Sequence, residues 1–153
     1  VSGSTIGATQ GAINAYRDVA SKRIGTNTGA KTAEDPHAQM AVARAQALVD
    51  QLKLRLKSIF DELMADARRG EATDMTKRIQ FRYESAAVPE ACLAEVLELQ
   101  KMCGGRGIFT DAPLQRFVLD ILAGRAHVAN NPYQFGRNYG GVQLGLESTD
   151  FFL

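Results

Sequence analysis

The chain has 153 residues, 45% of them hydrophobic, and its 18 basic and 17 acidic residues give a formal net charge of +1. This length is enough for one domain whose core needs no disulfide or metal to be stable. No basic block is longer than Arg68-Arg69, so nucleic acid is not expected as the main partner. No apolar run approaches the ~20 residues that span a bilayer, so no membrane partner is expected. The two isolated cysteines, Cys92 and Cys103, are expected to be small buried hydrophobes in a reducing cytoplasm.

Two helices are predicted in the first half of the chain. The first runs from Thr5 to about Arg23, and its apolar face is formed by Ile6, Thr9, Ile13, Tyr16 and Ala20. The second follows an Asp35 N-cap, has Pro36 in its first turn and ends before Gly70. Its apolar stripe is the most regular in the chain and consists of Val42, Ala45, Val49, Leu52, Leu56, Ile59 and Leu63.

Two more helices are predicted in the second half, and no segment shows a strand pattern. The third helix begins near Thr73 or Asp74 and reaches Met102, and Pro89 is predicted to kink or split it. The fourth opens at Asp111 and ends at Asn130-Asn131-Pro132. Residues 133–153 have no clear period and are predicted to form an irregular tail that packs on the domain or on a neighbouring chain. The expected fold is all-α, an antiparallel four-helix bundle over residues 1–132 followed by this tail.

The candidate site residues lie between Gly104 and Pro132. The turn Gly104-Gly105-Arg106-Gly107 can bring bare backbone N–H groups close to a ligand. Judged singly, however, glycines after a helix more often form a C-cap, and a lone helical histidine such as His127 more often packs than acts as a base. The one Glu-x-x-His spacing, Glu34 and His37, falls at the very start of the second helix, so facing helices carry no such pairs; cysteine ligand spacing and a Gly-x-Ser-x-Gly turn are also absent. Neither a metal nor a serine or cysteine nucleophile is therefore expected.

The order of these motifs resembles the C-terminal helical domain of acyl-CoA dehydrogenases over nearly the whole chain. The residues that carry the resemblance are Gly11 to Tyr16, Ser21-Lys22-Arg23, the long second helix, the Gly-Gly-x-Gly turn, Pro113-Leu-Gln-Arg116 and Asp120. The ending Arg125-Ala-His127-Val-Ala-Asn130-Asn-Pro132 looks like the flavin-dependent monooxygenase branch, the oxygenase components of two-component phenol hydroxylases. True dehydrogenases often carry a Tyr-Glu-Gly-Thr segment there, whose glutamate removes a proton next to a thioester. This chain has no glutamate in that stretch.

The resemblance implies an oxygen-dependent hydroxylation of a small aromatic substrate, with reduced FMN, or FAD as the alternative, supplied by a separate flavin reductase. It implies that His127 hydrogen-bonds the substrate hydroxyl and favours the phenolate, since an imidazole suits a proton acceptor at neutral pH. It also implies that Arg23, Gly104, Gly105, Arg106 and Gly107 contact flavin, often across a subunit boundary of a homotetramer.

The same resemblance implies an N-terminal helical domain and a middle β-domain that this chain does not contain. The chain starts at Val1, without a methionine, and is expected to be a fragment with little or no activity on its own. Two other functions stay open at this point. One is the C-terminal domain of an acyl-CoA dehydrogenase or thioester oxidase, and the other is a non-enzymatic helical module for oligomerisation.

Overall fold

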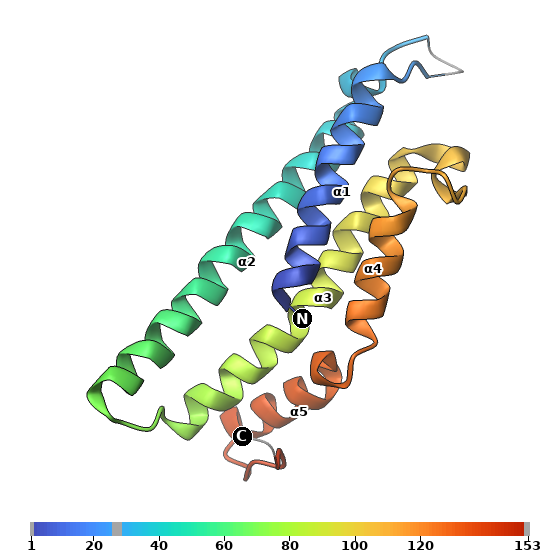
Figure 1. Ribbon diagram of the computed structural model, residues 1–153. Coiled ribbons are helices and arrows are strands. Elements are labelled where there is room, and N and C mark those ends of the chain that lie inside the picture. Colours follow the sequence, from blue (N-terminus) through green and yellow to red (C-terminus); the bar gives the residue numbers. More distant parts are fainter. Residues whose placement is uncertain (1, 26–28, 152–153) are drawn as a thin grey trace.

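The structure is a computed structural model that describes residues 2–25 and 29–151 (Figure 1). Its helices are α1 (Ser2–Lys22), α2 (Pro36–Arg69), α3 (Met75–Met102), α4 (Gln115–Arg125) and α5 (Pro132–Gln143), with short 3-10 helices η1 (Thr32–Glu34), η2 (Gly104–Ile108) and η3 (Val128–Asn130). Over the described ranges, the only extended pairing is an isolated bridge between Ile24 and Lys31. The expected all-helical fold is confirmed, although a fifth α-helix was not anticipated.

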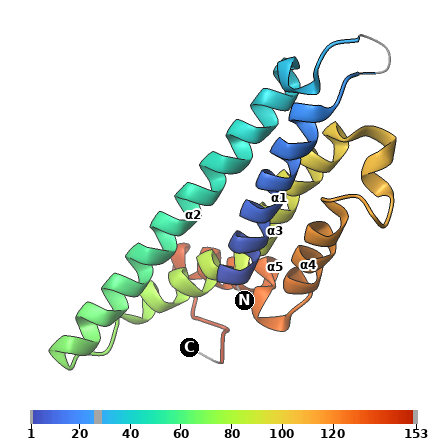
Figure 2. The ribbon, with the colours of Figure 1, turned by 45° about the horizontal axis from the view of Figure 1, so that its top comes forward.

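The helices from α1 to α4 run alternately up and down, and α3 lies at the centre (Figures 1 and 2). α3 contacts α1, α2, α4 and α5, while α1 also packs against α2 and α4. The 34 residues of α2 extend about 51 Å, whereas the 21 residues of α1 extend only about 32 Å. The far half of α2 therefore pairs with α3 beyond the reach of α1.

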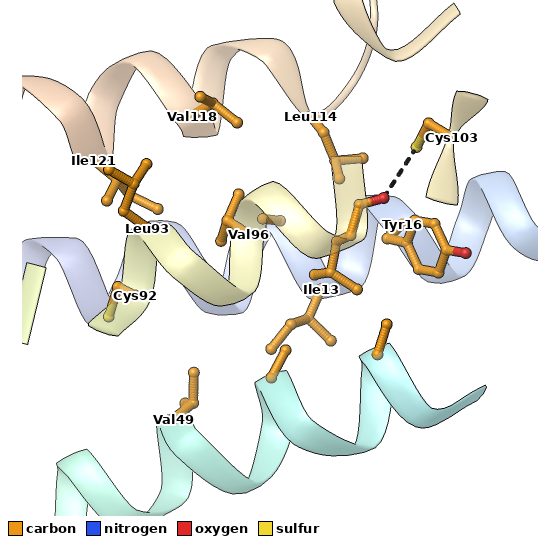
Figure 3. Packing of buried hydrophobic residues seen from close by; sticks show 14 of the residues in the cluster. Ile13, Tyr16, Val49, Cys92, Leu93, Val96, Cys103, Leu114, Val118 and Ile121 are labelled. Carbon is orange, nitrogen blue, oxygen red and sulfur yellow. Dashed lines mark hydrogen bonds between the residues drawn. The ribbon is translucent and has the colours of Figure 1, made fainter. Parts of the chain in front are cut away.

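The core forms where α1, α2, α3 and α4 meet (Figure 3). Side chains no more than 1% exposed come from all four helices and the residue that precedes α4, and they include Ile13, Tyr16, Val49, Val96, Leu99, Leu114 and Ile121. Cys92 and Cys103 are free and buried, as predicted. Burial raises the pKa of both thiols, and the Cys103 Sγ donates to the Leu99 carbonyl at 3.6 Å. The two cysteines therefore behave as packing residues.

The ends of α2 follow the sequence signals. Asp35 is the N-cap, and its carboxylate accepts a hydrogen bond from the His37 backbone N–H at 2.9 Å. Pro36 is the first helical residue, where its missing N–H costs nothing. Gly70 ends the helix in the left-handed conformation, with φ of 71°. The predicted start and stop of this helix are confirmed.

The third helix runs from Met75 to Met102 as one element with Pro89 inside it, so the prediction that Pro89 splits it is wrong. Pro89 has no N–H for the carbonyl of Ser85, four residues earlier. The Ser2 hydroxyl of α1 donates to that carbonyl at 2.8 Å. A hydrogen bond from a neighbouring helix thus replaces the one that proline removes.

The predicted bounds of the fourth helix are wrong at both ends. α4 starts at Gln115 rather than Asp111, because Ala112 and Gln115 make i to i−3 turns with Phe109 and Ala112. It ends at Arg125. In a continued helix the Gly124 carbonyl would accept from Val128, but it accepts instead from the His127 N–H at 3.3 Å and from the Asn130 side chain at 2.6 Å. The chain leaves the helix there, before His127.

The expectation that all residues after Pro132 form an irregular tail is also wrong, because residues 132–143 form α5, which packs on α3. Asn131 caps α5 by accepting from the Gln134 N–H at 3.2 Å. The segment after α5 folds back, and the buried Asn138 accepts from the Thr149 N–H at 2.6 Å. Of the apolar chain end, Phe151 is 92% exposed, and residues 152 and 153 lie outside the described part of the chain.

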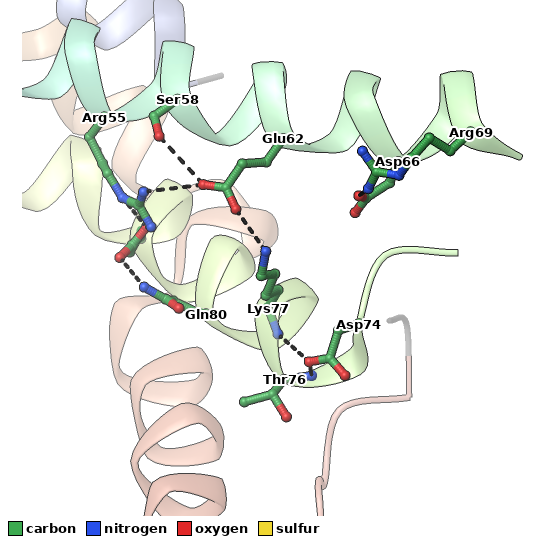
Figure 4. Close-up of polar contacts among 10 residues, drawn as sticks. Arg55, Ser58, Glu62, Asp66, Arg69, Asp74, Thr76, Lys77 and Gln80 are labelled. Carbon is green, nitrogen blue, oxygen red and sulfur yellow. Dashed lines mark hydrogen bonds and ion pairs between the residues drawn. The ribbon is translucent and has the colours of Figure 1, made fainter. Parts of the chain in front are cut away.

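Polar contacts join the far halves of α2 and α3 (Figure 4). Arg55 pairs with Glu84 at 2.6 Å, and Lys77 pairs with Glu62 at 3.1 Å. Asp74 caps α3 by accepting from the N–H groups of Thr76 and Lys77. Exposed ion pairs contribute little stability each, but these contacts link α2 to α3 in the half that α1 does not reach.

Candidate functional site

The predicted glycine turn lies directly after α3 and forms η2. Gly104 has φ of 65°, the left-handed region that a helix C-terminus favours and that side chains disfavour. A Cβ at Gly104 would lie 2.8 Å from Nη2 of Arg23, and a Cβ at Gly107 would lie 2.8 Å from the Gln100 carbonyl oxygen. A Cβ at Gly105 would meet nothing within 4 Å. Gly104 and Gly107 are therefore explained by the fold, and Gly105 is left with an open face.

Arg23 joins the end of α1 to the end of α3. Its Nη1 donates to the Met102 carbonyl at 2.9 Å, and its Nη2 lies against Gly104. A guanidinium at a helix C-terminus interacts favourably with the partial negative charge of the last carbonyls. The structure thus brings together Arg23 and the glycine turn, which are 81 residues apart in the sequence.

Arg23 and residues 105–107 of the turn line a cavity of about 1100 Å³, whereas Gly104 does not. Its lining residues are Val19, Lys22, Arg23, Ile24, Cys103, Gly105, Arg106, Gly107, Phe109, Asp111, Ala112, Pro113 and Leu114. Three of the charged residues are basic and one, Asp111, is acidic, so the lining attracts an anion. Arginine donors beside apolar side chains suit a ligand with both a phosphate and a ring system.

His127 lies elsewhere, and it is not on a helix. It precedes η3, and its side chain is exposed. Its Nδ1 accepts a hydrogen bond from the Ala129 backbone N–H at 3.1 Å. The 11 residues of α4, about 16 Å, separate this turn from the cavity end of the helix (Figure 1). Within one chain, the structure does not bring His127 to Arg23 and the glycine turn.

Neither a metal site nor a membrane-spanning helix is found among residues 2–25 and 29–151. No group of three or more His, Cys, Asp or Glu side chains in these ranges is arranged to hold a metal ion. None of the helices in this part of the chain is long and apolar enough to cross a membrane.

The family model described as "Acyl-CoA dehydrogenase, C-terminal domain" matches residues 1–132. This chain belongs to that family. It is 28% identical over 151 residues to the flavin-dependent monooxygenase oxygenase subunit HsaA of Rhodococcus jostii (strain RHA1), a match that covers 98% of the chain and 40% of the relative. It is also 28% identical over 145 residues to the pigment production hydroxylase of Rhodococcus sp. (strain ATCC 21145), covering 95% of the chain and 37% of that protein.

Among solved structures, the fold is similar to that of 3-HSA hydroxylase from Rhodococcus sp. RHA1, with a TM-score of 0.84 and 28% identity. The superposition covers 95% of this chain and 38% of that one. The chain thus spans about two fifths of the length of the relatives it matches. The resemblance to the acyl-CoA dehydrogenase superfamily and its monooxygenase branch is confirmed.

Sequence reasoning missed two residues that organise this acyl-CoA dehydrogenase C-terminal domain. The Gln100 amide donates to the Gly107 carbonyl at 3.0 Å and to the Gln115 side chain at 2.7 Å, and so ties α3, η2 and α4 together. Asn130 is buried and holds the turn that carries His127. A polar residue shortly before a glycine turn is a pattern that could have indicated the role of Gln100. No local pattern indicates that Asn130 is buried.

Proposed function

We propose that this chain is the C-terminal domain of the oxygenase component of a two-component, flavin-dependent aromatic hydroxylase. Flavin-dependent monooxygenase and hydroxylase relatives support this function over that of a thioester dehydrogenase or a non-enzymatic module. The observation that carries the proposal is the convergence of Arg23, Arg106 and an open-faced Gly105 on one cavity. The N-terminal helical domain and the middle β-domain of such an enzyme would supply the rest of the site.

The cavity fits the phosphate end of a flavin. Arg23 is held in place through Nη1, so its remaining donors are positioned before a ligand arrives. Arg106 and Lys22 add positive charge, and the backbone at Gly105 can approach a ligand closely. Gly104 and Gly107 shape the turn, and in a flavin-bound form they would contact the cofactor only through their backbone. We take reduced FMN as the cofactor, with reduced FAD as the alternative, and a flavin reductase as its supplier.

When bound, the reduced flavin supplies the activation of oxygen for transfer to the substrate ring. The part of this chain that would act on the substrate is His127, which hydrogen-bonds the phenolic oxygen and favours the phenolate. A phenolate ring is more electron-rich than a phenol ring, so hydroxylation is easier. Val128, next to His127, and the nearby Tyr133 are each 78% exposed and offer apolar surface for an aromatic ligand.

The helices α1 to α4 would act as an antiparallel four-helix bundle, to which α5 is added. The bundle would present two half-sites at opposite ends of α4, the cavity with Arg23 and the turn with His127. We further propose that the protein works in the cytoplasm as a homo-oligomer, a tetramer. In such an assembly the cavity of one chain and His127 of another can serve the same flavin. The two buried free thiols support a reducing compartment.

The function is tested by comparing two reactions of the full-length oxygenase. With reduced FMN or FAD, oxygen and a panel of phenols, it should form catechol-type products. Oxidised enzyme mixed with acyl-CoA thioesters without oxygen should keep its flavin absorbance. Bleaching by an acyl-CoA, with no phenol hydroxylated, would contradict the proposal.

A further inference from the structure

The imidazole of His127 is fixed by the backbone that follows it. Its Nδ1 accepts from the Ala129 N–H at 3.1 Å, and its carbonyl accepts from the Asn130 N–H at 2.8 Å. A backbone N–H can only donate, so Nδ1 is the unprotonated nitrogen as long as this contact holds. The neutral ring then carries its proton on Nε2, the nitrogen that does not take part in this contact.

Asn130 holds this turn in place. Its side chain is 3% exposed, and its Nδ2 donates to the Gly124 carbonyl at 2.6 Å. Together with the His127 N–H at 3.3 Å, this bond occupies the carbonyl that would otherwise continue α4. The backbone at His127 is extended, with φ of −67° and ψ of 135°. The neighbouring Asn131 is exposed and has a different task, because its side chain caps α5.

We propose that His127 meets the phenolic oxygen as a hydrogen-bond donor through Nε2–H, and that Asn130 is the positioning residue that fixes it in this state. The inference rests on the proposed hydroxylase function for the identity of the ligand. A donor binds an ionised oxygen more strongly than a neutral one, so Nε2–H favours the phenolate. The phenolic proton leaves to solvent, and His127 does not take it up.

The geometry can be tested on the 153-residue chain, which has only two histidines. In a ¹⁵N-labelled sample, with His37→Gln to assign the signals, the Ala129 amide should exchange slowly and couple to His127 Nδ1 across the hydrogen bond. His127→Asn places an acceptor near the position of Nδ1 and should keep the Ala129 amide protected from hydrogen exchange. His127→Gln should lose it. Rapid exchange of Ala129 in the wild type, or a proton on Nδ1 of the neutral ring, would overturn the inference.

The role of Asn130 has a matched control in the next residue. Asn130→Asp removes the donor to Gly124 and should lower the protection of the Ala129 amide from hydrogen exchange about tenfold, the worth of one buried hydrogen bond. Asn131→Asp makes the same chemical change at an exposed N-cap, which aspartate serves well, and should leave protection unchanged. Asn130→Ala repeats the test without a buried charge. Equal protection in the Asn130 and Asn131 variants would show that Asn130 does not position His127.

The donor role is tested in the full-length oxygenase with the same pair of His127 variants. Glutamine places an N–H near the position of Nε2, whereas asparagine keeps the turn and presents no group there. His127→Gln should retain more hydroxylation than His127→Asn, by about tenfold or more, and should keep the phenolate absorbance of a bound phenol. The reverse order would overturn the donor role while leaving the hydroxylase function intact. A wild-type enzyme that binds and hydroxylates no phenol would instead overturn the proposed function, and the donor role with it.

Discussion

At the scale of single residues, the η2 turn contains glycines with different tasks. Gly107 packs its backbone against the Gln100 carbonyl, where a Cβ would lie at 2.8 Å, whereas Gly105 faces open space. A glycine required by packing and a glycine left free for a ligand lie two residues apart. Substituting each with alanine therefore separates stability from binding.

We predict that Gly107→Ala destabilises the chain by about 1 to 3 kcal/mol, because a backbone carbonyl cannot move away cheaply. Gly105→Ala should change the free energy of unfolding by less than about 0.5 kcal/mol. In the flavin-binding form the added methyl group should keep the phosphate away from the backbone N–H and weaken flavin affinity about tenfold, the worth of one hydrogen bond to a charged group. Urea denaturation and flavin titration measure the two effects. Unchanged flavin affinity in Gly105→Ala would remove this turn from the cofactor site.

Tyr16 is a second residue with a testable environment. It is fully buried, and its hydroxyl has no hydrogen-bond partner in the part of the chain that the structure describes. Burial, with smaller contributions from Cys103 and Asp35, raises the pKa of Tyr16 to about 12. The unfolded chain loses this proton near pH 10, whereas the folded chain keeps it to about pH 12. The contribution of neutral Tyr16 to the free energy of unfolding is therefore fully present below pH 10. It is lost as the pH rises towards about 12, by up to about 3 kcal/mol.

Tyr16→Phe removes the unpartnered hydroxyl and keeps the ring. It should leave stability at pH 7 unchanged or raise it by up to about 1 kcal/mol. It should also reduce the loss of stability between pH 10 and 12. Urea denaturation of both proteins at several pH values measures this. A loss of more than about 1 kcal/mol at pH 7 would show that the hydroxyl has a partner.

Sequence reasoning at this scale selected Arg23 and the glycine turn, because the order of helices and glycines indicated a known domain. The structure brings them together, and their contact with flavin stays a prediction. It misjudged the surroundings of His127. The helical period of residues 114–128 continues past Arg125, but the helix stops because Asn130 captures the Gly124 carbonyl. That bond depends on the burial of Asn130, which no local pattern shows.

At the scale of elements, α5 was missed because glycines usually mark loops. Gly136 is there for packing, since a Cβ would lie 2.9 Å from the ring of Tyr83 on α3. Tyr83 also stacks on Tyr139, with ring centroids 5.7 Å apart. The pair Asn131-Pro132 was read as the end of a helix, although an N-cap followed by proline is equally a start signal. The apolar face of α1 depends only on local spacing, and all five residues predicted for it are buried. In the α2 stripe only Ala45, Val49 and Ile59 are buried.

The continuity of α3 through Pro89 gives a prediction for a pair of elements. Ser2→Ala should cost about 0.5 to 1.5 kcal/mol, because it leaves the Ser85 carbonyl without its donor. In a Pro89→Ala background the backbone N–H restored at position 89 can serve that carbonyl, so Ser2→Ala should cost less. A double-mutant cycle by urea denaturation measures this coupling. An equal cost of Ser2→Ala in both backgrounds would contradict it.

At the scale of the whole molecule, the domain keeps its two candidate half-sites apart. The cavity lined by Arg23 reaches Leu114, just before α4, whereas His127 follows the other end of that helix. The course of α4 between them can be followed in Figures 1 and 2. A flavin and a phenol can use both half-sites only when other chains or domains complete the site. We therefore predict that the 153-residue chain by itself hydroxylates no phenol, as measured by product analysis with reduced flavin and oxygen.

The most direct test of the account is hydroxylation of a phenol by the full-length oxygenase with reduced flavin and ¹⁸O-labelled oxygen gas, followed by mass spectrometry of the product. The wild type should incorporate one labelled oxygen atom into a catechol-type product. His127→Ala should form at least about tenfold less product and release correspondingly more hydrogen peroxide. A product without the label, or wild-type yield from His127→Ala, would contradict the account.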